Sequence, residues 1–97
     1  MRAYKIKFSK RAALEFKDLQ KSNQKKYKKV IKTLGLLEVN PKHPGLNTHK
    51  YQSVEGPNGQ DVFEAYVENN TPGAYRIFWY YGPAKSMITV LAITPHP

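Results

Sequence analysis

The chain is 97 residues long, and its 40% apolar and 12% aromatic content suffices for one modest core, so we predict a single domain over residues 1–97. It contains no cysteine, which excludes disulfides, thiolate nucleophiles and cysteine-ligated zinc and is typical of a reducing cytoplasm, and no apolar run approaches the roughly 20 residues that cross a membrane. The net charge of +9 is uneven, with +11 on residues 1–53 and −2 on residues 54–97, which indicates either a polyanionic partner for the basic half or a solvated lysine surface.

The first part of the chain reads as one strand followed by two helices. Residues 3–8 alternate apolar side chains with lysines, as a half-buried strand does. Ser9 then supplies an N-cap for a helix that ends near Gln20. Ser22 or Asn23 caps a second helix that ends near Glu38. Because only about three residues join them, the two helices form an antiparallel hairpin.

Each predicted helix carries one apolar stripe at the helical period. The stripes predict the following buried residues: Phe16, Leu19, Val30, Ile31 and Leu34. Leu14 lies off the first stripe, so it either closes the end of the core or is exposed to a partner. Neither helix can bury its stripe without a sheet, which the rest of the chain has to supply.

The second part of the chain reads as strands. Two prolines and a glycine exclude regular structure from residues 40–48, and Gly56 to Gly59 form a tight turn. Runs rich in β-branched and aromatic residues predict strands at 49–52, 62–68, 74–81 and 86–93. The fold class is therefore α+β, an antiparallel β-sheet with a two-helix hairpin packed on one face.

Several classes of active site lack their usual sequence support. The three histidines have no i, i+4 pairing and no adjacent acidic ligand, so the common zinc spacings are missing. No glycine-rich phosphate-binding loop occurs, and neither Ser53 nor Ser86 stands in a glycine-flanked nucleophile elbow. A metal site, nucleotide binding and acyl-enzyme chemistry are not indicated.

Polar side chains on two neighbouring strands are the best remaining signal. If alternate residues of these strands face the helices, then Glu64, Tyr66, Arg76 and Tyr80 share the other face of the sheet. This face would carry an acid, a guanidinium group and aromatic rings. The alternative is a Glu64–Arg76 ion pair that merely decorates a solvated sheet.

Three basic groups elsewhere in the chain are also candidates. His96 ends the last strand between two prolines, which restrict its backbone, although a terminal histidine is usually a frayed surface residue. His49 and Lys50 follow the rigid loop and either bind a phosphate or face solvent. One face of the second helix carries a cluster of lysines that suits a polyanion such as RNA: Lys25, Lys28, Lys29 and Lys32.

The chain as a whole resembles the RelE/ParE superfamily of type II toxin–antitoxin toxins. The resemblance is carried by Tyr4 to Ser9, by Asn40 to Lys50, by Tyr75 to Trp79 and by the C-terminal strand that closes in His96. It is nearer to the RNA-cleaving RelE, YoeB and HigB types than to ParE, because Arg76 and His96 coincide with positions that such nucleases use.

The resemblance implies a RelE-like fold and metal-independent cleavage of mRNA, commonly on the ribosome, by attack of the 2′-hydroxyl on its own phosphodiester. It implies no cofactor and an acidic antitoxin as partner. Arg76 is expected to clamp the phosphate and His96 to act as general acid, while Lys50 binds the RNA backbone.

The chain also departs from the family pattern. Glu64 and Glu68 stand where RelE has lysines, so Glu64 as a general base is our own assignment, and Pro97 replaces a tyrosine that often completes the site. Tyr66 or Tyr80 is expected to stack on a base instead. The alternative function is that of ParE-like members, which inhibit DNA gyrase without cleaving RNA.

Overall fold

The structure is a computed structural model that describes residues 3–96 of the chain. Its helices and strands follow the predicted order with somewhat different ends, but residues 40–48, predicted to lack regular structure, contain a short 3₁₀ helix. They are β1 (Lys5–Phe8), α1 (Lys10–Ser22), α2 (Gln24–Val39), the short 3₁₀ helix η1 (Pro44–Leu46), β2 (His49–Glu55), β3 (Asp61–Tyr66), β4 (Tyr75–Tyr81) and β5 (Met87–Pro95). No helix within residues 3–96 combines the length and the apolar character needed to cross a membrane.

The five strands form one sheet in the order β1-β5-β4-β3-β2. Strands β2 to β5 pair with their sequence neighbours in antiparallel fashion, as the predicted antiparallel sheet requires. Strand β1 lies beside β5 and runs parallel to it. Parallel neighbours need a long crossover connection, and here the helices and the other strands provide it.

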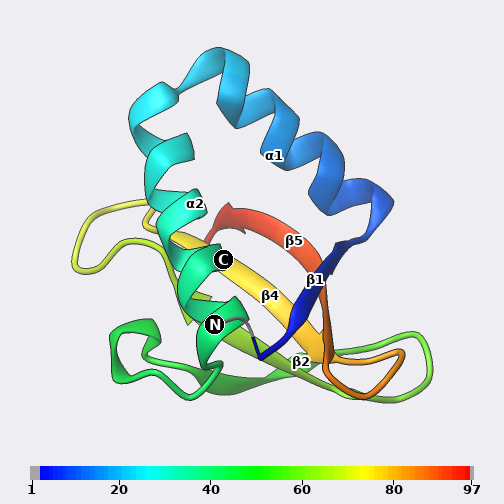
Figure 1. Cartoon of the computed structure of the whole chain (residues 1–97). Helices are drawn as coiled ribbons and strands as arrows, with labels where there is room; N and C mark the ends of the chain where they lie inside the picture. The colour runs from blue at the N-terminus through cyan, green and yellow to red at the C-terminus, as the bar shows by residue number, and fades with distance from the viewer. Residues whose placement is uncertain (1–2, 97) are drawn as a thin grey trace.

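The helical hairpin covers one side of this sheet, as predicted (Figure 1). The Ser9 side chain accepts a hydrogen bond from the Ala12 amide at 3.0 Å and caps α1. Asn23, the only residue between the helices, caps α2 by accepting from the Lys26 amide at 3.1 Å. Of the two predicted caps for α2, the structure selects Asn23, because α1 continues through Ser22.

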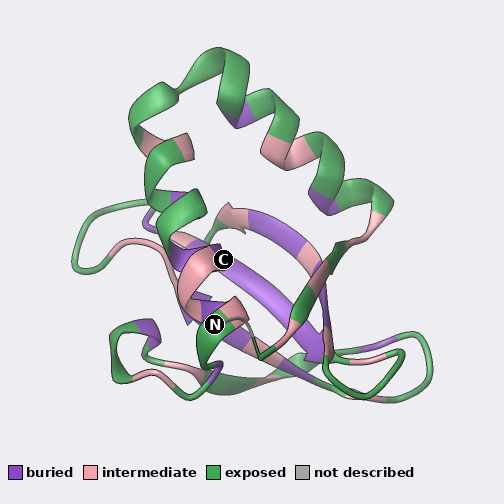
Figure 2. Cartoon of the chain, in the orientation of Figure 1, coloured by how far each residue is buried: buried purple, intermediate pink, exposed green. Residues whose placement is uncertain are grey.

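The main core lies between the hairpin and the sheet (Figure 2). Leu19, Val30 and Leu34 are buried there, as their stripes predict. Phe16 is half-buried and stacks between the rings of Phe8 and Tyr27, at centroid distances of 5.3 and 4.9 Å. The hairpin is therefore held by an aromatic contact between both helices and β1.

The predicted burial of Ile31 is wrong, since 45% of this residue's surface is exposed. Val30, the preceding residue, is fully buried and Leu34 nearly so, so the buried arc of α2 is narrower than its apolar arc. Ile31 lies at the edge of that arc and lines a shallow hollow between the two helices and β1. Leu14 is also exposed, at 62%.

Strand β5 has a bulge that α1 holds in place. Phe78 pairs with Ala92 and Trp79 with Val90, so the ladder skips Leu91. The Ser9 hydroxyl donates to the Leu91 carbonyl at 2.9 Å, and a Glu15 carboxylate oxygen accepts from the Ile93 amide at 2.8 Å. Hydrogen bonds from the side chains of Ser9 and Glu15 thus take the place of ladder bonds beside the bulge. They fix the course of the C-terminal strand toward His96.

Candidate active site

The strand register places the predicted polar residues on one face. Glu64 stands opposite Phe78, and Tyr66 stands opposite Arg76. The alternate residues of both strands, among them Ala65 and Ile77, belong to the core under the helices. The prediction that Glu64, Tyr66 and Arg76 face away from the helices is therefore confirmed.

Arg76 is held in a fixed position although it is almost fully buried. Its Nη1 donates to the carbonyl oxygens of Glu68 at 2.6 Å and Tyr75 at 3.2 Å, and its guanidinium carbon lies 3.6 Å from the centre of the Tyr66 ring. Its Nε is buried without a hydrogen bond to any described residue, 3.7 Å from a Glu64 carboxylate oxygen. Nη2 is the nitrogen left to meet a ligand. A Glu64–Arg76 ion pair does form, but within a buried cluster rather than on a solvated sheet.

His96 joins this cluster from the end of β5. Its Nδ1 lies 2.6 Å from Oε2 of Glu64, and its backbone amide donates to the Ala74 carbonyl at 2.8 Å. The His96 side chain is 46% exposed, whereas that of Glu64 is 5% exposed. A buried carboxylate thus orients an accessible imidazole, the arrangement that prepares a histidine for proton transfer through its Nε2.

Two further groups border the cluster on the side of β2. Nε2 of His49 lies 3.0 Å from the Tyr66 hydroxyl, and the two rings meet edge to face with their centroids 5.2 Å apart. His49 stands directly opposite Glu64 in the β2–β3 ladder. The cluster that we refer to below as the active cluster consists of these residues: His49, Glu64, Tyr66, Arg76 and His96.

Besides the lysines of α2, two predicted RNA-binding residues lie outside this cluster. Lys50 stands opposite Phe63, on the other face of the sheet, and pairs with Asp61 at 3.3 Å. Tyr80 is only 6% exposed, so it has little ring surface to offer to a base. Of the two tyrosines considered for stacking, Tyr66 is the one that belongs to the active cluster.

The lysines of α2 divide into two groups. Lys29 pairs with Glu68 at 3.2 Å, as does Lys26, whose ammonium group also lies 4.3 Å from the centre of the Tyr75 ring. Lys25, Lys28 and Lys32 are exposed.

Glu68 links the lysines of α2 to the active cluster. Burial by itself would raise the pKa of Glu68, but hydrogen bonds from the Tyr75 amide, Lys29 and Lys26 outweigh burial and lower it. The carboxylate is therefore ionised at neutral pH, and the two lysines balance its charge. The backbone carbonyl of the same residue accepts a hydrogen bond from Arg76.

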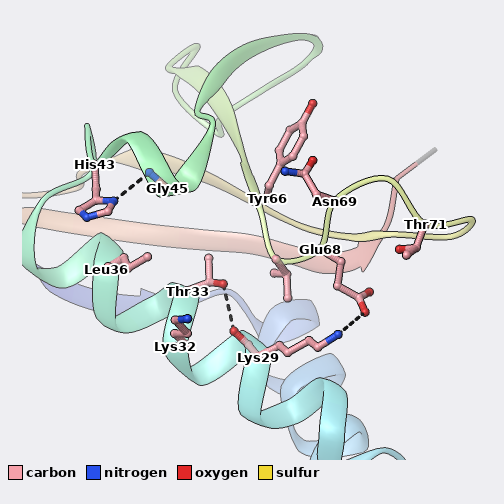
Figure 3. A pocket seen from close by; sticks show the side chains of 11 residues that line it. Lys29, Lys32, Thr33, Leu36, His43, Gly45, Tyr66, Glu68, Asn69 and Thr71 are labelled. Atoms are coloured by element: carbon pink, nitrogen blue, oxygen red, sulfur yellow. Dashed lines mark hydrogen bonds and ion pairs between the residues drawn. The ribbon is translucent and has the colours of Figure 1, made fainter.

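A cleft of about 550 Å³ lies between α2 and the end of β3 (Figure 3). Its walls include Lys29 and Lys32 from α2, His43 from the loop before η1, and Tyr66. No pattern in the sequence singled out His43, which lines the cleft because its loop packs beside α2. No group of three or more His, Asp or Glu side chains within residues 3–96 is placed to hold a metal ion.

The arrangement of the elements has counterparts among solved structures. The YoeB/ParE toxin from Agrobacterium tumefaciens superposes with a TM-score of 0.72 at 9% identity, over 96% of this chain and 99% of that one. The archaeal RelE of the RelE–RelB complex from Pyrococcus horikoshii gives 0.67 at 21% identity, over 96% and 94%. The chain has the RelE-like fold.

A third match to this RelE-like fold is the YoeB dimer from Staphylococcus aureus, with a TM-score of 0.66 at 15% identity over 98% of this chain and 99% of that one. No protein-family model matches the chain, and no curated protein matches its sequence. The predicted fold is therefore confirmed by structure, whereas identities this low leave activity to the residues of the site.

Proposed function

We propose that this protein is the toxin of a type II toxin–antitoxin system and that it cleaves mRNA without a metal ion. The observation that carries the proposal is the active cluster, in which a fixed guanidinium group and a carboxylate-bound imidazole share the open face of a RelE-like sheet. Cleavage of RNA by its own 2′-hydroxyl needs a cation for the phosphate and a proton for the leaving oxygen. Arg76 and His96 supply these two groups.

In this mechanism Arg76 binds the scissile phosphate through Nη2. Its other nitrogens are occupied by the Glu68 and Tyr75 carbonyls or face Glu64, so the guanidinium is oriented before RNA binds. The 2′-oxygen attacks the phosphorus and negative charge builds up on the phosphorane oxygens. A preorganised donor at this position stabilises that charge at no further cost of orientation.

His96 protonates the departing 5′-oxygen through Nε2, because Nδ1 is bound to Glu64. The products are a 2′,3′-cyclic phosphate and a 5′-hydroxyl end. Glu64 holds the ring and stabilises its protonated form through Oε2. Glu64 removes the 2′-hydroxyl proton through Oε1, the carboxylate oxygen that does not contact His96, so one proton is taken up as His96 gives another to the 5′-oxygen.

RNA binding outside the cleavage step is assigned to the basic half of the chain. Tyr66 stacks on a base and His49 holds the Tyr66 hydroxyl. The exposed lysines of α2 contact ribosomal RNA, while Lys50 contributes a more distant phosphate contact from the opposite face of the sheet. The ribosome is the expected site of cleavage, in the cytoplasm.

The expected partner is an acidic antitoxin that covers the basic half and uses exposed Leu14 as an apolar anchor. The solved structures with this fold include the RelE–RelB complex and a complex described as a YoeB–YefM toxin–antitoxin heterotetramer. Their existence supports a partner of this kind for the present chain.

Mapping of transcript ends tests the proposal. Purified protein is incubated with mRNA, in EDTA without ribosomes and in magnesium buffer with ribosomes, and the ends of the products are identified. Cyclic phosphate and 5′-hydroxyl ends that disappear in the His96→Gln variant support the mechanism. Intact mRNA in both reactions, together with inhibited gyrase, would replace it with the non-enzymatic function.

A further inference from the structure

The cleft between α2 and the end of β3 is continuous with the active cluster through Tyr66. The ring of Tyr66 contacts the Arg76 guanidinium on the face away from the helices, and Tyr66 is also one of the residues of the cleft wall, together with Lys29 and Lys32. Strand β2 begins only at His49, opposite Glu64, so beyond this point β2 leaves that edge of β3 uncovered. Nucleic acid bound at Arg76 can therefore continue past Tyr66 into the cleft.

The polar groups of the cleft suit a phosphate. Lys32 is exposed, and the ammonium group of Lys29 points to the cleft wall where it meets Glu68 (Figure 3). Among residues 3–96, Glu68 is the one carboxylate that lines the cleft, and it is already neutralised by Lys26 and Lys29. The net charge of the side chains that line the cleft is therefore positive, which favours an anionic ligand.

His43 adds a directed donor to this positive charge. Its Nδ1 accepts a hydrogen bond from the Gly45 amide at 2.9 Å, so a neutral ring carries its hydrogen on Nε2. Gly45 leaves room for this position, because a Cβ atom there would lie 3.0 Å from Nδ1 of His43 and crowd it. The histidine is thus the N-cap of η1 and, at its other nitrogen, a donor for a ligand.

We propose that this cleft binds a backbone phosphate of the substrate RNA strand that flanks the cleaved nucleotide, through Lys32 and His43. The inference rests on the proposed function and extends it, since it assigns Lys32 to the substrate strand rather than to ribosomal RNA. Tyr66 separates this phosphate from the scissile one and stacks on the base between them.

The test measures binding of a short single-stranded RNA whose 2′-hydroxyl at the cleavage point is methylated, so that binding is separated from cleavage. One neutral methylphosphonate linkage is moved along the strand. The parental protein should lose about twofold to fivefold in affinity when the neutral linkage occupies the cleft. Lys32→Gln and His43→Asn should each lose a similar amount of affinity for normal RNA. Placing the neutral linkage in the cleft should then weaken their binding no further. The side-chain oxygen that His43→Asn introduces can still accept from the Gly45 amide and cap η1.

Lys21→Gln is the matched control, because Lys21 is an exposed helix lysine outside the cleft and the active cluster. It should remain fully sensitive to the position of the neutral linkage. If Lys32→Gln and His43→Asn also remain fully sensitive, the cleft does not hold the phosphate and the inference is overturned. The inference is also overturned if these variants weaken the binding of an acidic peptide but leave RNA binding unchanged. Because binding is measured without cleavage, a protein that fails to cut RNA can still pass this test, and one that cuts can fail it.

Discussion

Arg76→Ala is the substitution that tests the active cluster most directly. It removes a cation that makes two hydrogen bonds to carbonyls and lies over the Tyr66 ring. Loss of one well-placed donor to a developing oxyanion costs on the order of 3 kcal/mol, so cleavage should slow by about a hundredfold or more. Single-turnover cleavage of ribosome-bound mRNA at saturating protein measures this step without a contribution from binding.

The same substitution also costs stability, and the two effects have to be separated. Two hydrogen bonds from a charged group and one cation–π contact are worth about 4–8 kcal/mol together, a large part of the roughly 5–15 kcal/mol that stabilises a typical domain. Urea unfolding therefore has to establish that Arg76→Ala is folded before its cleavage rate is compared with the parental rate. Arg76→Lys keeps the charge and should lose less of both activity and stability. Folded Arg76→Ala protein that cleaves at the parental rate would refute the assignment of Arg76 to the phosphate.

Three more predictions concern proton transfer, the bulge in β5 and the carboxylate under α2. His96→Gln keeps a hydrogen bond to Glu64 but cannot donate a proton, so single-turnover cleavage should fall by about 10²- to 10⁴-fold, and an unchanged rate would exclude His96 as the acid. Glu15→Ala leaves a β5 amide without its acceptor and should cost about 1–3 kcal/mol in urea unfolding, whereas Arg11→Ala, which breaks only an exposed pair with Glu15, should cost less than about 1 kcal/mol. Glu68 has a lowered pKa, so its stabilisation is present above its ordinary pKa of 4.5 and is lost as the pH falls through the lower folded value. Glu68→Gln should therefore destabilise the protein at pH 7 and not at strongly acidic pH, and an equal effect at both would contradict the ion pairs with α2.

The elements and their faces were predictable from sequence because they depend on local periodicity. Alternation along a strand decides which side chains share a face, and this put Glu64, Tyr66 and Arg76 together before any pairing was known. Capping depends on a single side chain and the amides that follow it, so Ser9 was recognisable as one helix start and the pair Ser22 and Asn23 as the other, from which the structure selects Asn23.

The contacts that make the site were decided only by tertiary structure. Glu64 and His96 are 32 positions apart, and their 2.6 Å contact depends on the register of three strands and on the bulge at Leu91. Likewise, the loop packing that makes His43 part of a cleft depends on how distant segments meet. Local patterns describe each element in isolation, whereas these contacts arise where elements far apart in the chain pack together. The sequence by itself therefore determined which residues were available to the site, and only the assembled sheet and hairpin decided which of them meet.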